Sequence, residues 1–119
     1  MSSSDEKRRV LDIVENIEAA LSYVGALDVE AFSKNSLVID ACERCLQRIT
    51  EAAVKLGEER LSEIAPNVRF AVLKGMGNML RHEYDLISAR IVYETVRFDL
   101  PRFAEDCQRF LAEQDVEDG

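Results

Sequence analysis

The chain has 119 residues, of which 47% are hydrophobic and 32% are charged, and its formal net charge at pH 7 is −8. A chain of this length builds one core, so we expect a single domain over residues 1–119 with an ordered core of about residues 5–113. The negative charge argues against broad non-specific binding to nucleic acid, which rests on neutralisation of phosphates by Lys and Arg. No apolar run approaches the ~20 residues that span a bilayer, and the N-terminus lacks a secretory pattern. We therefore expect a cytoplasmic protein with no membrane contact.

Only five glycines and two prolines interrupt the chain, which favours long helices over short strands. The first predicted helix begins near Ser4, a candidate N-cap, and ends at Gly25. Its apolar residues recur at helical spacing and are Val10, Ile13, Val14, Ile17, Leu21 and Val24. A short turn or helical segment over residues 27–35 then leads to a second predicted helix, from about Ser36 to Gly57.

The second half of the chain predicts two more helices. After a loop that contains Pro66, the third helix is expected from about Val68 to the mid-80s. Its predicted buried residues are Val72, Leu73, Met76, Leu80 and Tyr84. The fourth helix begins near Ser88 and continues past Pro101, which removes a backbone donor and is expected to kink or split the helix. Four amphipathic helices with short connections predict an all-α fold, an up-and-down antiparallel four-helix bundle with a kinked or split last helix.

The three cysteines are expected to be reduced and buried, because an odd number without an export signal does not suggest a disulfide framework. Cys42 and Cys45 form a C-x-x-C pair on one helical face, and with Cys107 and His82 they make up a conceivable Cys3His zinc site. No second paired ligand motif supports that site. We therefore expect neither a metal nor a cofactor.

One broad polar stripe stands out on the third predicted helix. Its members are three or four residues apart and are Lys74, Asn78, Arg81, His82 and Asp85. Such a face meets either solvent or another copy of the protein. From residue 69 to 102 the basic residues also outnumber the acidic ones, which allows a local anion site. Serine hydrolase, di-iron and phosphate-loop motifs are absent from the sequence.

Three segments resemble the HEPN superfamily and, within it, the HepT-like proteins of MNT/HEPN toxin–antitoxin systems. VIDACERCLQRITEAAVKLG is similar to that family's second-helix signature, and ARIVYETVRFDLPRF is similar to its fourth helix. GMGNMLRHEY resembles the family's core motif, G-M-R-N-x-L-x-H-x-Y. The resemblance spans roughly residues 8–112 in the family's order.

The resemblance implies a bundle that forms a homodimer, with the motif helices of two protomers lining one cleft. Members of the family are metal-independent endoribonucleases with an Arg-x4-6-His motif, and a minimal nucleotidyltransferase acts as the antitoxin. In that scheme His82 is the acid or base on RNA, with Asn78 beside it, and a two-fold axis supplies a second histidine. Tyr84 completes the H-x-Y part of the motif and corresponds to the residue that the nucleotidyltransferase modifies with AMP.

The sequence departs from the motif at Gly77, which stands where the family has its arginine. Arg81, one turn later, is the first candidate for a replacement cation, since its planar fork grips a phosphate bidentately. Lys74 is the second. Glu51 is a candidate polar partner from the second helix, and Asp85 is a further supporting residue on the motif helix.

Two functions from different classes stay open at this point. The first is an RNA-cleaving toxin that uses His82 and Arg81. The second is a catalytically inactive HEPN module that binds a partner, a nucleotide or RNA without cutting. Gly77 favours the inactive module, whereas Asn78, His82 and Tyr84 favour the toxin.

Overall fold

The computed structural model describes residues 1–81 and 88–118 of the chain. Two long antiparallel helices form its centre, α1 (Ser3–Val24) and α3 (Ser36–Leu56). Helix α1 begins where the Ser2 hydroxyl accepts a hydrogen bond from the Asp5 amide at 3.2 Å, and it ends at Gly25, whose φ is 49°. The helix therefore begins slightly earlier than the sequence predicted.

Asn35 and Gly57 set the bounds of α3. The Asn35 side chain accepts a hydrogen bond from the Val38 amide at 3.1 Å, and Gly57 follows the last residue with a φ of 89°. The short helix α2 (Val29–Ser33) connects α1 to α3 and buries Phe32. The two long helices and the short segment between them confirm the sequence prediction.

A short helix that the sequence analysis did not predict, α4 (Glu58–Ile64), follows α3 directly. Arg60 of α4 donates hydrogen bonds to both carboxylate oxygens of Glu6 in α1, at 2.6 and 2.8 Å. It also donates to Glu63 within α4 at 2.8 Å. The guanidinium also lies over the Phe110 ring, 5.2 Å from its centroid. These contacts join α4 to both ends of the chain.

The fourth predicted helix is divided into α6 (Ala89–Glu94), a π-helical segment η1 (Thr95–Asp99) and α7 (Leu100–Asp118). The wide turn lies just before Pro101, whose ring would meet a carbonyl of an ordinary α-turn. Arg97 in η1 donates to the carbonyls of Gly25 and Leu27 at 3.0 and 3.1 Å. The interruption predicted near Pro101 is therefore a π-turn, and Arg97 links that turn to the loop after α1.

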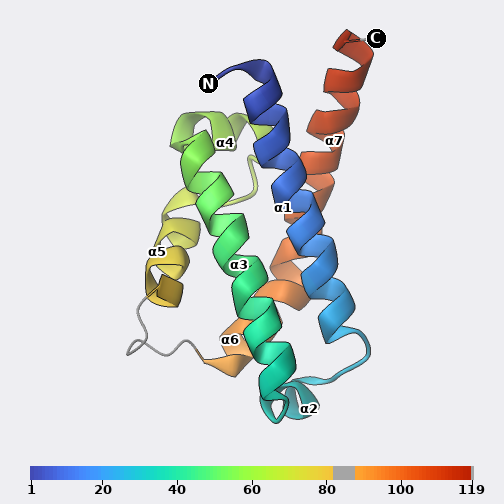
Figure 1. Ribbon diagram of the computed structural model, residues 1–119, viewed down its shortest axis with the longest axis vertical. Helices are drawn as coiled ribbons and strands as arrows, with labels where there is room; N and C mark the ends of the chain where they lie inside the picture. The colour runs from blue at the N-terminus through green and yellow to red at the C-terminus, as the bar shows by residue number, and fades with distance from the viewer. Residues whose placement is uncertain (82–87, 119) are drawn as a thin grey trace.

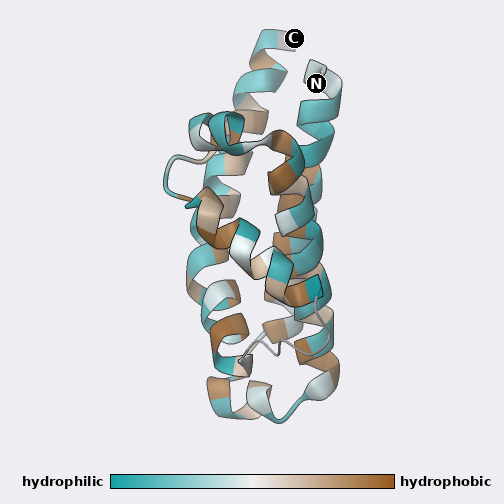
Figure 2. Cartoon of the chain, turned by 90° about the vertical axis from the view of Figure 1, so that its left-hand side faces the viewer, coloured by the Kyte–Doolittle hydropathy of each residue, from teal (hydrophilic) through white to brown (hydrophobic). Residues whose placement is uncertain are grey.

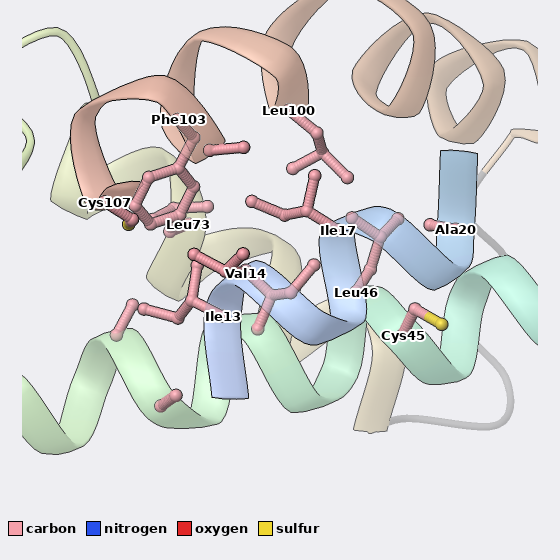
Figure 3. Packing of buried hydrophobic residues seen from close by; sticks show 14 of the residues in the cluster. Ile13, Val14, Ile17, Ala20, Cys45, Leu46, Leu73, Leu100, Phe103 and Cys107 are labelled. Atoms are coloured by element: carbon pink, nitrogen blue, oxygen red, sulfur yellow. The ribbon is translucent and has the colours of Figure 1, made fainter. Parts of the chain in front are cut away.

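The helices make an all-α, up-and-down bundle (Figure 1). Helix α5 (Phe70–Arg81) lies against α3 on one flank, and α7 lies against α1. The core between them is apolar, and Figure 3 shows Ile13 and Ile17 of α1 among Leu46, Leu100 and Phe103. In the described part of the chain, no helix has the length and apolar character needed to cross a bilayer. The predicted fold class is confirmed.

Candidate functional site

Helix α5 carries the candidate motif. A close contact between Gly77 of α5 and Thr50 of α3 sets the distance between the two helices. Gly77 is buried, and a Cβ atom at this position would lie 2.7 Å from Oγ1 and 3.0 Å from Cβ of Thr50. Thr50 is itself buried, and its hydroxyl donates to the Gln47 carbonyl at 3.0 Å. The position where the motif has arginine therefore faces the helix interface, with no room for a side chain in the present packing.

The polar stripe on α5 is exposed over its described part. Lys74, Asn78 and Arg81 all lie on the surface, and the Arg81 guanidinium donates to the Asn78 side-chain oxygen. Within residues 1–81 and 88–118, Lys74 has no hydrogen-bond or ion-pair partner. The structure thus places one oriented cation and one unpaired cation on the same face.

Three of the predicted site residues, His82, Tyr84 and Asp85, lie outside the described residues. Arg81 is the last described residue before them and also the last residue of α5. The structure therefore describes the first three members of the predicted polar stripe, and the role of the stripe stays a prediction.

Glu51 does not touch α5 through any described hydrogen bond or ion pair. It lines an open groove of about 240 Å³ between α1 and α3, which we call the α1–α3 groove. The other lining residues are Arg9, Asp12, Asn16, Arg48, Ala52 and Lys55. The predicted partnership between Glu51 and the motif helix stays a prediction, because the end of that helix is not described.

A second groove adjoins α5, and its lining corrects one sequence prediction. Val72 was expected in the core with Leu73, yet Val72 is 50% exposed while Leu73 is buried. Val72 and Met76 line a groove of about 260 Å³ against η1 and α7, which we call the α5–α7 groove. Its other lining residues include Arg69, Thr95, Asp99, Arg102 and Phe103. Helix α5, which faces the viewer in Figure 2, carries hydrophobic and hydrophilic residues in turn, and the side that carries Val72 stays exposed although α5 packs on α3.

A comparison with family models matches residues 13–110 to the family described as Ribonuclease HepT-like. The chain belongs to the HepT-like ribonuclease family. The described part of its motif segment lies on α5 and its second-helix signature lies on α3, so the Gly77–Thr50 contact joins two of the three segments that resemble the family.

Curated relatives agree with the HepT-like assignment. Two proteins of Methanocaldococcus jannaschii, named Putative RNase MJ1216 and Putative RNase MJ0125, are each 27% identical to this chain. The first match covers 98% of this chain and 94% of the relative, and the second covers 93% and 95%. A protein of Caldanaerobacter subterraneus named Putative RNase TTE0752 is 28% identical over 86% of this chain and 90% of its own length. No solved structure matches the chain significantly.

The three cysteines of this HepT-like chain are buried thiols. Burial raises the pKa of Cys107 to about 12, and burial with the neighbouring Cys45 and Glu43 raises that of Cys42 to about 11. The Cys42 thiol donates to the Ala20 carbonyl at 3.8 Å. Among the described residues no group of His, Cys, Asp and Glu side chains has the arrangement of a metal site.

Two features of the site were missed by sequence reasoning. Thr50 was not singled out, because nothing in a single sequence tells which residue of one helix opposes a glycine of another. Arg48 and Lys55 were also passed over, although their spacing of seven residues around Glu51 places all three on one face of α3. That spacing was the signal in the sequence that could have identified this charged face of α3.

Proposed function

We propose that this protein is a metal-independent endoribonuclease toxin that a minimal nucleotidyltransferase neutralises. The observation that carries the proposal is the exposed Arg81 guanidinium, which Asn78 orients from one turn earlier and which immediately precedes His82. A cation that stabilises charge on a phosphate and a histidine that transfers protons are together suited to cleaving an RNA phosphodiester. Membership of the HepT-like ribonuclease family supports the same reading.

The chemistry assigns a separate task to each group. His82 removes the proton of a ribose 2′-hydroxyl, and the 2′-oxygen then attacks the adjacent phosphorus. The bond from phosphorus to the 5′-oxygen breaks, which leaves a 2′,3′-cyclic phosphate and a 5′-hydroxyl. A second histidine supplies the proton to the leaving oxygen, and Arg81 stabilises the charge on the phosphate oxygens.

A homodimer supplies that second histidine, since the chain contains only one. We propose the α5–α7 groove as the contact between the two copies. Val72, Met79, Ile91 and Phe98 are exposed on α5, α6 and η1, the elements that line or adjoin the groove, and Phe98 has 63% of its surface exposed. The groove also holds an acid, Asp99, and two cations, so each copy brings charges of both signs to this contact.

The nucleotidyltransferase acts on Tyr84 in this proposal, transferring AMP to the phenol oxygen beside His82. Added AMP places a negative phosphate where the RNA phosphate has to lie, so the modified protein is inactive. A small nucleotidyltransferase frame overlapping this gene supports the pairing, whereas its absence counts against it. Co-expression with that partner should raise the intact mass by one AMP group, and replacing Tyr84 with Phe should abolish the increase.

A catalytically inactive binding module is the second candidate function, and the Gly77–Thr50 contact favours it. With no side chain admitted at position 77, the family's arginine is absent and its place is filled by α3. Such a module keeps the dimer and the nucleotidyltransferase but holds RNA without cutting it.

The deciding experiment compares the wild-type protein with His82→Ala. We expect wild type to cleave RNA to products with 2′,3′-cyclic phosphate ends, and the variant to be inactive with an unchanged dimer mass and melting temperature. If His82 were only a packing residue, the variant would lose about 1 kcal/mol or more of stability and activity would fall only with the folded fraction. If a folded wild-type dimer cuts no RNA, the binding module is the correct function.

A further inference from the structure

We infer that the α1–α3 groove is a binding site for the phosphodiester backbone of single-stranded RNA, built by Arg9, Arg48 and Lys55. The inference rests on the proposed function, because it places a strand of the substrate on a surface next to the motif helix. It assigns the RNA contact to residues outside the motif.

The groove gathers cations that have neither an ion pair nor a side-chain hydrogen bond within the described part of the chain. Across the described residues, most basic side chains form an ion pair or a side-chain hydrogen bond; examples are Lys34 with Glu30 at 3.3 Å and Arg90 with Glu94 at 2.9 Å. Basic side chains without either contact are Arg9, Arg48, Lys55, Arg69, Lys74 and Arg102. Half of these unpaired cations therefore meet in one groove of a chain whose net charge is −8.

The carboxylates of the groove do not cancel this charge. Asp12 pairs with Arg8 at 3.1 Å, and Arg8, which is not a lining residue, also lies 3.8 Å from Glu15. Glu51 is the only other lining carboxylate and has no ion-pair partner among the described residues. Three lining cations against two lining carboxylates leave the groove with a net positive charge.

The spacing of the cations suits a strand better than a small anion. Arg48 and Lys55 are seven residues apart on α3, which separates their backbones by about 10 Å along the helix axis. Arg9 faces them from α1. Because the lining residues include no aromatic side chain on which a base stacks, the groove is suited to contact the backbone without reading sequence.

Helix geometry connects the groove to the motif face. Thr50 and Gly77 mark the line of contact between α3 and α5. Glu51 follows Thr50 by about 100°, and Asn78 follows Gly77 by the same angle. Since α3 and α5 run antiparallel, equal rotations from their contact turn both residues to the same side of the helix pair. Figure 1 shows α1, α3 and α5 side by side, so a strand lying in the groove reaches Asn78 and Arg81 by crossing α3.

The test measures binding of a single-stranded 2′-O-methyl RNA by fluorescence anisotropy over a series of salt concentrations. This probe lacks the attacking hydroxyl, so binding is read without cleavage. For Arg48→Ala/Lys55→Ala we expect at least about tenfold weaker binding at low salt and a salt slope reduced by about 1.4, from about 0.7 per lost phosphate contact. Glu51→Gln, which removes one of the two lining carboxylates, should strengthen binding.

The matched control is Lys34→Ala/Arg90→Ala. It removes the same number of charges from side chains that are 75% and 73% exposed and lie outside the groove. Equal weakening by both double variants would mean that only overall charge matters and would overturn the inference, as would unchanged binding by the groove variant. Equal competition by a mononucleotide at matched phosphate concentration would also overturn it, because the site would then hold a small anion.

Cleavage by wild type separates this inference from the proposed function. If wild type cleaves RNA and the groove variant has an unchanged KM, the groove inference fails and the ribonuclease stands. If wild type binds RNA through the groove but does not cleave it, the ribonuclease fails and the groove inference stands.

Discussion

Thr50 of α3 occupies the space that a side chain at Gly77 of α5 would need: a Cβ atom added to Gly77 would lie 2.7 Å from the Thr50 hydroxyl oxygen. Real Cβ atoms do not approach other atoms so closely. Thr50 cannot easily withdraw, because it is β-branched, buried and hydrogen-bonded to the Gln47 carbonyl. The missing motif arginine is therefore coupled to the packing of two helices.

Gly77→Ala should lower the free energy of unfolding by about 1–2 kcal/mol, since overpacking outweighs the helix-propensity gain of about 1 kcal/mol. Gly75→Ala is the matched control, two residues earlier in the same helix with nothing within 4 Å of an added Cβ atom. The control should stabilise the protein by about 0.5–1 kcal/mol. Urea unfolding of both variants checks the prediction, and equal stabilisation of the two would contradict the close contact.

Thr50→Ala should partly rescue Gly77→Ala in a double-mutant cycle, because it removes the hydroxyl but leaves the Cβ contact of 3.0 Å.

The motif alone predicts that Gly77→Arg restores activity. The packing at Thr50 predicts the opposite result, a loss of folded protein. Yields of folded Gly77→Arg at or above wild type would show that α5 moves away from α3 at little cost.

The long helices were predictable from sequence because their apolar residues recur without interruption between clear caps, as in α1 from Ser2 to Gly25. Helix α4 was not predictable in the same way, since its attachment to the bundle depends on the hydrogen bond from Arg60 to Glu6, a residue that is remote in sequence. Val72 was assigned to the core because a stripe of apolar residues does not reveal that α5 buries only one side of it. The exposed side lines the α5–α7 groove. Sequence does not predict this groove because it depends on how α5 and α7 are placed in space.

The ion pair between Glu6 and Arg60 predicts a loss of stability in acid. The hydrogen bond from Arg60 lowers the pKa of Glu6, and the Glu6 side chain is only 17% exposed. Because the folded pKa is below the unfolded one, the contribution is complete above the unfolded value of about 4.3 and disappears as pH falls through the folded value. Glu6→Gln should cost about 1–2 kcal/mol at pH 7 and nothing in strong acid.

The control for this prediction is Glu94→Gln, which breaks the exposed pair with Arg90. An exposed pair contributes about 0.5 kcal/mol or less, so this variant should melt close to wild type at every pH. Urea unfolding at neutral and acidic pH measures both variants. A Glu6→Gln deficit that persists unchanged in strong acid would mean that packing, not charge, is responsible.

The buried thiols should resist alkylation in the folded protein. Burial raises the pKa of Cys107 to about 12, so almost no thiolate forms at pH 8, and access is blocked as well. We expect iodoacetamide to leave all three cysteines unmodified in native protein and to modify all three in urea, as counted by intact mass. Fast labelling of Cys107 under native conditions would show that α7 opens readily.

The dimer contact predicts that a charge at Phe98 produces monomers. Phe98→Glu places a carboxylate at the most exposed of the apolar residues proposed for the interface, and we expect the dissociation constant to rise about tenfold or more. Val116→Glu is the control, since Val116 is 82% exposed and lies near the C-terminal end of α7, well beyond Phe103, the last residue of that helix that lines the groove. Light scattering over a dilution series measures both, and a Phe98→Glu dimer as tight as wild type would exclude this face.

Arg81 and Lys74 both present a cation on the exposed face of α5, and among the described contacts a hydrogen bond to Asn78 orients Arg81 while none orients Lys74. If Arg81 stabilises charge on the phosphate, Arg81→Ala should reduce kcat about a hundredfold and Lys74→Ala should reduce it much less. Arg81→Lys keeps the charge but not the planar fork, so it should recover only part of the rate. The kcat of Asn78→Ala should fall between those of wild type and Arg81→Ala, because the change frees the guanidinium without removing it.

All four side-chain changes are on the surface, so melting temperatures should stay near wild type. A larger loss in Lys74→Ala than in Arg81→Ala would transfer the role of the missing arginine to Lys74.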